Sequence, residues 1–416
     1  MMENKEQVLL IACQIKGTNE QKFHTSLEEL KQLTETANGE VADVVVQKRD
    51  KIHAALYIGE GKLEEIQYTL EMNPVDLVIL NDEVSPGQLK NLSNRLDARV
   101  IDRTQLILDI FAGRARTREG KLQVELAQMQ YLLPRLAGQG TELSRLGAGI
   151  GTRGPGETKL ETDRRHIRRR ITEIKEQLRA VVNQRSQYRK RRKENQAFQI
   201  AIVGYTNAGK STLFNRLTKS ESLEENQLFA TLDPLTRRIR LENGFEAIIT
   251  DTVGFIQDLP TTLVAAFRST LEEVTEADFI LHVVDGSNED FPQHEQTVYN
   301  LLDELGAGGL PMLTIYNKRD QFKAGFIPNS YPYITISAFD DGDLNRLLKK
   351  MEEVVKSEWK YYELQVPVQD GRLLHRIKNH TIVETEDFEP ATEDYMLTGY
   401  VDPNHPIYEH YINKEQ

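Results

Sequence analysis

Residues 198–218 read FQIAIVGYTNAGKSTLFNRLT, an apolar run followed by a glycine-containing loop and an amphipathic segment. The run FQIAIVG predicts a buried strand, and STLFNRLT predicts a helix. Between them, residues 204–211 match the spacing G-x-x-x-x-G-K-[ST]. A strand, a loop of this spacing and a helix form the phosphate-binding unit of P-loop proteins. The stretch therefore predicts a P-loop α/β domain.

Each residue type in this loop suits a polyphosphate ligand. The glycines permit backbone N–H groups to wrap the α- and β-phosphates, Lys210 sets a positive charge against the β- and γ-phosphates, and the Ser211 hydroxyl can ligate Mg²⁺. A chance match in a chain of this length is of order one in a hundred from average residue usage. The residues expected around the nucleotide are Gly204, Tyr205, Thr206, Asn207, Ala208, Gly209, Lys210, Ser211 and Thr212.

Three further motifs follow in the order that a GTPase requires. ITDTVGF (249–255) ends a strand with D-x-x-G, so Asp251 can hold Mg²⁺ through water and the Gly254 N–H can reach the γ-phosphate. IYNKRD (315–320) ends another strand with N-K-x-D, and ISAF (336–339) ends the last one. Each motif alone is a weak signal, whereas the ordered set is very strong.

The last two motifs select guanine. The Asp320 carboxylate can accept hydrogen bonds from the guanine N1–H and exocyclic amine, a donor pair that adenine lacks. The Ala338 N–H can reach the guanine O6. The expected base-binding residues are Asn317, Lys318, Asp320, Ser337 and Ala338, so GTP and GDP are the predicted ligands.

The stretch FATLDPLTR (229–237) lies between the phosphate loop and Asp251 and predicts the first switch. Spacing favours Thr231 over Thr236 as the residue that completes the Mg²⁺ shell when a γ-phosphate is present. Phe229, Ala230 and Thr231 therefore join the expected nucleotide site. The predicted Mg²⁺ ligands are Ser211, Thr231 and Asp251.

The position after D-x-x-G decides how the attacking water is held. Many GTPases have Gln there, whereas this chain has Phe255, which cannot hydrogen-bond water. Slow intrinsic hydrolysis is expected unless another element or a partner completes the site. The Asn207 amide oxygen either coordinates a K⁺ ion that bridges the phosphates or only shapes the loop. The candidate catalytic residues are Thr231, Gly254 and Asn207.

A second glycine run, LGAGIGTRGPGETKLETDRR (146–165), matches the dinucleotide fingerprint G-x-G-x-x-G. That fingerprint requires a preceding strand and a βαβ unit. Here a helix end and a polar loop precede it, and a heptad helix follows. The context argues against a dinucleotide site and leaves a dinucleotide oxidoreductase as a remote alternative. The glycines with Arg145, Arg153 and Lys159 instead predict a cationic tip that approaches phosphates and splayed bases; the alternative is a plain flexible hairpin loop.

The segment after this tip is strongly basic. The chain as a whole carries −12, yet residues 164–193 hold thirteen Lys/Arg and two Asp/Glu, a net charge of +11, which leaves −23 for the remainder. Heptad apolar positions precede and follow the glycine run, which predicts an antiparallel helical hairpin. The alternatives for the basic run are a surface that faces polyphosphate and an ordinary solvated helix face.

The patterns together predict an α/β chain of four parts. Strand-like runs at 7–15, 41–47, 75–80 and 98–102 alternate with helical segments and predict a small parallel sheet over 1–101. The other parts are a helical hairpin over 102–196 with its tip loop at 137–160, a P-loop G domain over 197–358, and a small C-terminal α+β module over 359–416. The stretch YIGEGK (57–62) either only forms a tight turn through its two glycines or contacts a phosphate.

Composition indicates a cytoplasmic protein. The single cysteine, Cys13, excludes an intramolecular disulfide and suits a reducing compartment. No run of about 18 apolar residues predicts a membrane span, and the first residues do not read as a signal peptide. Nothing in the sequence demands a dimer, so a monomer is expected.

The chain resembles the HflX family of ribosome-associated GTPases over essentially its whole length. The resemblance rests on GIGTRGPGETKLETDRR (149–165), GYTNAGKSTLFN, FATLDP, DTVGFI and YIGEGK. This sequence has Lys159 where many members have Gln, and GAG at 147–149 where many have GGG. Phe255 fits as well, because the family belongs among GTPases with a hydrophobic residue in place of the catalytic Gln.

The resemblance implies binding to the large ribosomal subunit, GTP hydrolysis stimulated there, and splitting of stalled or idle 70S ribosomes. The tip loop would reach toward the peptidyl-transferase centre, and the basic helices would line rRNA. Three rival functions are weighed against this one. The first is an RNA-modification or RNA-remodelling GTPase that acts on free RNA, and the second is a G-protein scaffold without catalysis. The third, a remote one, is a dinucleotide oxidoreductase.

Overall fold

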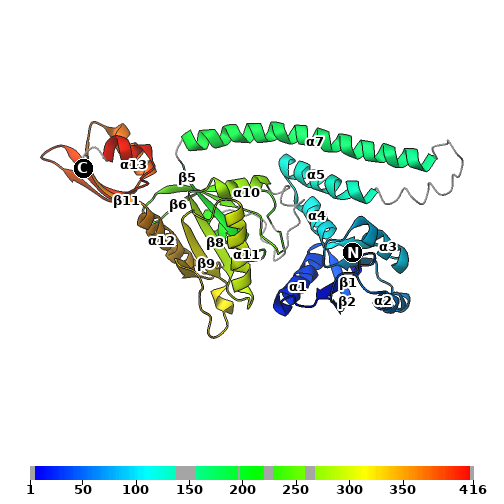
Figure 1. Cartoon of the computed structure of the whole chain (residues 1–416). Helices are drawn as coiled ribbons and strands as arrows, with labels where there is room; N and C mark the ends of the chain where they lie inside the picture. Colours follow the sequence, from blue (N-terminus) through cyan, green and yellow to red (C-terminus); the bar gives the residue numbers. More distant parts are fainter. Residues whose placement is uncertain are drawn as a thin grey trace. The chain divides into compact units, whose positions relative to one another are not determined.

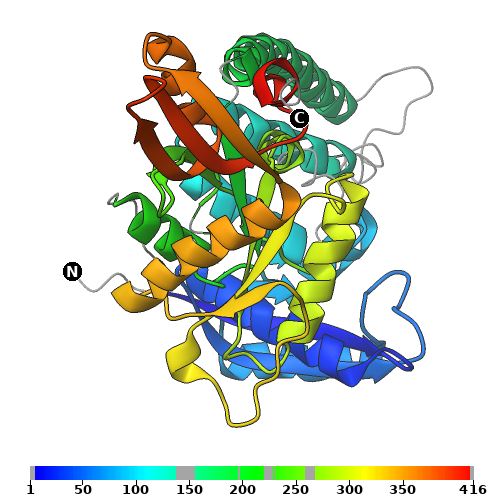
Figure 2. The same cartoon turned by 90° about the vertical axis from the view of Figure 1, so that its left-hand side faces the viewer.

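The structure, a computed structural model, describes residues 5–136, 155–194, 197–219, 228–229, 231–257 and 268–412. The chain divides into two compact units, each seen in Figures 1 and 2. The first unit comprises Met1–Asn183, Gln227–Phe229 and Gln257–Arg268, and the second comprises Gln184–Asn226, Ala230–Ile256 and Ser269–Gln416.

The first unit is built on a four-stranded parallel sheet, as predicted. The strands have the order β2-β1-β3-β4, and β1 pairs in parallel with both β2 and β3. Their bounds are β1 Glu6–Ile15, β2 Gly39–Arg49, β3 Leu77–Leu80 and β4 Val100–Asp102. The connecting helices are α1 Glu20–Thr36, α2 Glu60–Met72 and α3 Pro86–Leu96. Residues 8–12 of β1 are fully buried, which explains the continuous apolar run in that strand.

Two helices follow the sheet where the sequence pattern suggested one. The Asp102 side chain accepts a hydrogen bond from Gln105 N and opens α4, Arg103–Arg114. The helix then ends at Ala115, which has an extended conformation. The Thr117 hydroxyl caps Gly120 N at 2.9 Å and starts α5, Arg118–Arg135. The first arm of the helical hairpin predicted from residue 102 is therefore divided into two helices, the second of which begins at the Thr117 cap.

Helix α5 packs against the long helix α7, Pro155–Glu194 (Figure 1). Ile171 and Ile174 of α7 are buried, and Arg170 forms a two-bond ion pair with Glu125 of α5, at 2.6 and 2.9 Å. The predicted pairing of two helices is thereby observed within the first unit. Most of the predicted tip, residues 137–154 with Arg145 and Arg153, lies outside the described residues, as do the side chains of 155–160.

The second unit contains the P-loop sheet. Its strands have the order β10-β9-β8-β5-β7-β6, with only β6 antiparallel to its neighbour among the pairs described. Their bounds are β5 Phe198–Gly204, β6 Leu235–Arg240, β7 Glu246–Asp251, β8 Phe279–Asp285, β9 Met312–Asn317 and β10 Tyr333–Thr335. The helices are α8 Lys210–Thr218, α10 Arg268–Thr275, α11 Phe291–Glu304 and α12 Asp341–Glu358, with a 3-10 turn η2 at Arg319–Gln321. This doubly wound topology gathers the carboxyl ends of the parallel strands at one edge.

The C-terminal part is a small antiparallel sheet in the order β11-β13-β12. Its elements are β11 Lys360–Pro367, α13 Gly371–His380, β12 Ile382–Glu389, β13 Asp394–Val401 and a π-helical turn η3 at Tyr408–Ile412. The sequence pattern missed β12, because the segment IVETEDFE is mostly exposed and acidic. Ile382 shares one hydrophobic core with the G-domain sheet, and Trp359 and Tyr400 pack against that core.

Within the described ranges, no helix has both the length and the apolar character needed to cross a bilayer.

Candidate nucleotide-binding site

The phosphate loop lies between β5 and α8 at the carboxyl edge of the G-domain sheet. Its backbone takes left-handed conformations at Asn207, with φ +61°, and at Gly209, with φ +92°. A Cβ on Gly209 would lie 2.3 Å from Asn317 Nδ2, so this position requires glycine. Helix α8 begins directly after it. Backbone N–H groups at a helix start attract phosphate.

Lys210 occupies the interior of this loop. Its ammonium donates a 2.7 Å hydrogen bond to the carbonyl oxygen of Tyr205, and only 6% of the residue is exposed. Burial lowers the pKa of Lys210 to about 8, although Asp251 opposes the shift. A bound polyphosphate would supply the negative charge that stabilises the protonated form.

We expect GTP affinity to fall as the pH rises above about 8. In the empty loop Lys210 then loses its proton, whereas the bound phosphates require the charged form, so binding must take up a proton. The affinity should decline by up to about tenfold per pH unit. Titration with a fluorescent GTP analogue measures this.

The control is Lys210→Arg, because the guanidinium stays charged throughout this range. Its affinity should be independent of pH. A flat profile for the wild-type protein would show that Lys210 is already charged in the empty loop.

Three oxygen-bearing side chains meet beside Lys210. The Ser211 and Thr231 hydroxyls donate to Asp251 Oδ2 at 2.8 Å each and lie 2.7 Å from one another. The second oxygen of Asp251, Oδ1, is buried without a hydrogen-bond partner in the part of the chain that the structure describes. Burial raises the pKa of Asp251, and Lys210 opposes this. Hydroxyl and carboxylate oxygens around an unsatisfied carboxylate suit a small hard cation such as Mg²⁺.

The two switch threonines occupy different places. Thr231 reaches Asp251, whereas the Thr236 hydroxyl pairs with Thr250 on the neighbouring strand at 3.1 Å. The structure therefore brings Thr231, and not Thr236, to the predicted Mg²⁺ ligands.

Leu228 and Phe229, shortly before Thr231, belong to the first unit. The Phe229 ring is buried there and meets Phe111 of α4 edge-to-face at 4.7 Å. Leu228 N lies 3.3 Å from the Thr36 hydroxyl at the end of α1. Phe229, expected near the nucleotide, thus places its ring in the core of the first unit, because burial of an aromatic ring outweighs any contact it offers a phosphate. Ala230 lies outside the described residues.

The residue after D-x-x-G is fixed to the phosphate loop. Phe255 N donates to Gly204 O at 3.1 Å, and Thr206 N donates to Phe255 O at 2.8 Å. A Cβ on Gly254 would lie 2.8 Å from Thr206 Cγ2 and 3.0 Å from Lys210 Nζ. Only glycine fits this approach, and it brings the Gly254 backbone against the loop.

The base-binding motifs are joined by one side chain. Asn317 donates through Nδ2 to Ala208 O at 2.9 Å and accepts through Oδ1 from Ala338 N at 3.0 Å. The Ala338 N–H, expected to face guanine O6, therefore contacts Asn317 in this structure. The sequence motif did not reveal this bridge, because the side chain's direction depends on the fold.

The other two residues of the motif are held in place by neighbours. Lys318 forms a 2.6 Å ion pair with Asp285. Asp320 is exposed, and a hydrogen bond from the Ser337 side chain keeps the pKa of its carboxyl below the usual range. An exposed, ionised carboxylate at this edge is ready to accept two hydrogen bonds.

His294 lies next to the phosphate loop, and no motif in the sequence predicted this. His294 of α11 stacks on the Tyr205 ring with centroids 3.9 Å apart and an angle of 8°. Burial lowers the pKa of His294 to about 4, so the imidazole is neutral near pH 7 and supports the loop by packing.

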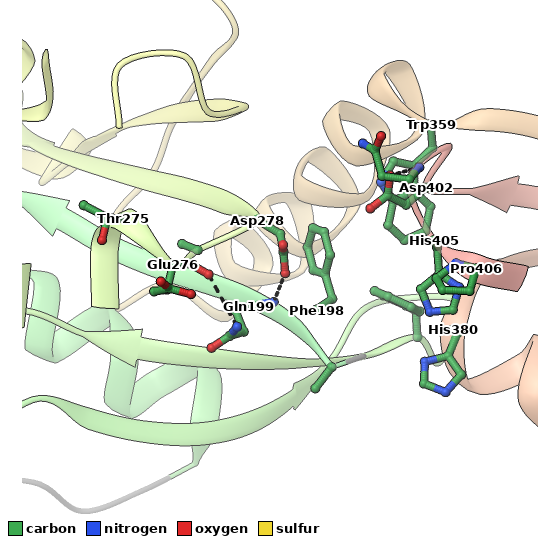
Figure 3. A pocket seen from close by; sticks show the side chains of 14 residues that line it. Phe198, Gln199, Thr275, Glu276, Asp278, Trp359, His380, Asp402, His405 and Pro406 are labelled. Carbon is green, nitrogen blue, oxygen red and sulfur yellow. Dashed lines mark hydrogen bonds between the residues drawn. The ribbon is translucent and has the colours of Figure 1, made fainter. Parts of the chain in front are cut away.

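A separate hollow of about 450 Å³ lies elsewhere in the second unit (Figure 3). Phe198 and Trp359 meet edge-to-face in its wall at 5.5 Å, and the rings of His380 and His405 lie 5.0 Å apart. Its lining contains none of the motif residues described above. The nucleotide motifs therefore define a different site.

Three protein families match consecutive parts of the chain. Residues 24–112 match the family described as GTP-binding GTPase N-terminal, and residues 114–192 match GTP-binding GTPase Middle Region. Residues 199–318 match the family described as 50S ribosome-binding GTPase.

Curated relatives match over nearly the whole length. GTPase HflX of Alkalihalophilus pseudofirmus is 54% identical over 97% of this chain and 95% of its own. The protein of that name from Caldanaerobacter subterraneus subsp. tengcongensis is 48% identical over 94% and 90%. That of Escherichia coli is 42% identical over 87% of each.

Among solved structures, a GTP-binding protein from the archaeon Sulfolobus solfataricus in complex with GDP is similar at 25% identity. The match covers 85% of this chain and 99% of that one, with a TM-score of 0.45.

Proposed function

The chain belongs to the HflX family of GTPases, and from that premise we propose that it splits stalled or idle 70S ribosomes. It would bind the large subunit, and the ribosome would stimulate its GTP hydrolysis. The observation that carries the proposal is the meeting of the phosphate loop, Asp251 and the N-K-x-D motif at one sheet edge. That edge lies in a domain that matches ribosome-binding GTPases.

The nucleotide would be held at three places. The backbone of 204–209 and the Lys210 ammonium would bind the phosphates, and Asp320 would select guanine. Ser211, Thr231 and Asp251 would hold Mg²⁺, which neutralises charge on the β- and γ-phosphates when bound. The Asn207 amide oxygen is our candidate ligand for a K⁺ ion.

Thr231 would report the state of the nucleotide. It hydrogen-bonds Asp251 here, while Phe229, two residues earlier, is buried in the first unit. Contact with the γ-phosphate end would keep Thr231 at Asp251, and loss of that phosphate would release it. GTP would therefore order the switch for ribosome engagement, and hydrolysis would release the protein.

Helix α7 would provide the contact with rRNA. Arg165, Arg168, Arg169 and Arg179 are exposed, whereas the apolar positions Ile171 and Ile174 are buried. The helix thus presents arginines outward from the side that packs on α5. A protein that carries −23 elsewhere is repelled by RNA except along such a surface.

We expect the double variant Arg165→Gln/Arg168→Gln to bind large subunits more weakly and with less salt dependence. Each lost phosphate contact should reduce the slope of log affinity against log salt by about 1. Binding is measured by co-sedimentation at several KCl concentrations. The control Arg238→Gln/Arg372→Gln removes two exposed arginines of the second unit, and an equal loss in this control would assign the effect to overall charge.

Sedimentation of 70S ribosomes with the protein tests the proposed function. The protein with GTP, or with a non-hydrolysable analogue, should convert 70S particles into subunits, and large subunits should accelerate GTP turnover. Intact 70S particles together with unchanged turnover would overturn the proposal. Preferential binding of isolated stem-loops or tRNA would instead support the rival that remodels free RNA.

A further inference from the structure

The side chain of Thr206, in the middle of the phosphate loop, has an unexplained hydroxyl. Thr206 is 7% exposed, and its Oγ1 is buried without a hydrogen bond to any residue that the structure describes. Its backbone N–H has a partner, since Thr206 N donates to Phe255 O. A buried hydroxyl without a partner destabilises the fold, so its retention in this loop points to a ligand.

Three nearby hydroxyls have hydrogen-bond partners. Ser211 and Thr231 bond Asp251, and the Thr252 hydroxyl donates to Ile202 O at 2.7 Å. Thr206 differs from these three residues in having a buried hydroxyl without a described partner.

The position of Thr206 identifies the part of the nucleotide that it faces. Its Cγ2 and Cα lie 2.8 and 3.0 Å from the point where a Cβ on Gly254 would be, and Lys210 Nζ lies 3.0 Å from the same point. In P-loop GTPases, the loop lysine and the D-x-x-G glycine hold the γ-phosphate. Thr206 and Lys210 therefore both lie beside Gly254, at the γ-phosphate end of the loop, with the Thr206 methyl carbon as the side-chain atom nearest Gly254.

The position directly after D-x-x-G, which holds a water-orienting Gln in many GTPases, has an apolar residue here. Phe255 occupies this position, is 5% exposed, and is fixed to Gly204 and Thr206 by backbone hydrogen bonds. An apolar ring excludes bulk water but cannot direct a single water molecule.

We propose that the Thr206 hydroxyl orients the water that attacks the γ-phosphate. The proposal rests on the GTPase function proposed above. The hydroxyl oxygen accepts a hydrogen bond from the water, which directs a water lone pair toward phosphorus in line with the leaving group.

The reaction balances without a base on the protein. The bond from the water oxygen to the γ-phosphorus forms, and the bond from that phosphorus to the β,γ-bridging oxygen breaks. The electron pair of the broken bond stays on GDP, and the proton of the water passes to the inorganic phosphate. Thr206 acts through orientation and keeps its own proton.

Three variants test this proposal. Thr206→Val removes the hydroxyl at constant shape, Thr206→Ser keeps the hydroxyl and removes the methyl group, and Thr236→Val is the matched control on β6. Single-turnover GTP hydrolysis is measured with protein in excess, together with the dissociation constants of fluorescent GDP and of a non-hydrolysable GTP analogue.

Thr206→Val should hydrolyse GTP at least about tenfold more slowly. The dissociation constants of GDP and of the GTP analogue should each change less than about threefold, because the hydroxyl is proposed to contact the attacking water and not the bound nucleotide. Thr206→Ser should retain most of the rate, and Thr236→Val should match the wild type.

Equal rates for Thr206→Val and the wild type would overturn the proposal. So would a loss of analogue affinity that parallels the loss of rate, or a Thr206→Ser variant as slow as Thr206→Val. A wild-type protein without any GTP hydrolysis, even with ribosomes, would instead refute the proposed function itself.

Discussion

The variant Asp320→Asn is expected to bind GTP at least about a hundredfold more weakly and to prefer xanthosine triphosphate. The exposed Asp320 carboxylate accepts from the guanine N1–H and amine, whereas an asparagine amide brings a donor against the amine. Xanthine has a carbonyl at that place and accepts from the amide. Competition of GTP and xanthosine triphosphate for a fluorescent nucleotide measures the change.

The matched control is Asp341→Asn, which neutralises an exposed carboxylate that pairs with Arg216. It should leave the preference for guanine intact. If Asp320→Asn still bound GTP as tightly as the wild type, the N-K-x-D motif would not read the base.

The variant Lys210→Ala is expected to lose most of its GTP affinity and all GTP-dependent splitting of 70S ribosomes. The ammonium is buried in the phosphate loop, and removal of one partner from a buried charge pair costs about 2–5 kcal/mol, which corresponds to roughly a thirtyfold to several-thousandfold loss of affinity. Nucleotide titration and 70S sedimentation measure the two effects.

The control is Lys219→Ala, at the exposed far end of the same helix. Its nucleotide affinity and splitting activity should match the wild type. Splitting by Lys210→Ala at normal rates would show that ribosome dissociation does not depend on the nucleotide.

The fold could be predicted largely because its elements alternate regularly. Apolar runs separated by amphipathic segments specify parallel strands and crossover helices, and both parallel sheets follow that rule. The acidic strand β12 could not be predicted from its own residues, because it is stabilised by pairing with β13 and not by its own hydrophobicity. The break between α4 and α5 depends on one cap at Thr117.

The nucleotide-binding motifs could be recognised in the sequence because the ligand fixes their spacing. Each motif places a charged side chain or a backbone N–H donor at the end of a strand. Side-chain directions are a different matter. Three features depend on how segments distant in the sequence pack together. They are the burial of Phe229 against Phe111, the stacking of His294 on Tyr205 and the buried Thr206 hydroxyl without a described partner. No periodicity in the sequence encodes those contacts.

The Asn317 bridge has a consequence for how the two ends of a nucleotide cooperate. One amide group links the loop for the phosphates to the loop for the base before any ligand arrives. The conformational entropy of both loops is then lost during folding and not on binding. A ligand that contacts both loops therefore binds more tightly than two separate ligands, because its second contact is intramolecular. Guanosine and pyrophosphate added as separate molecules should bind far more weakly than their joined form, with the covalent link acting as a high effective concentration.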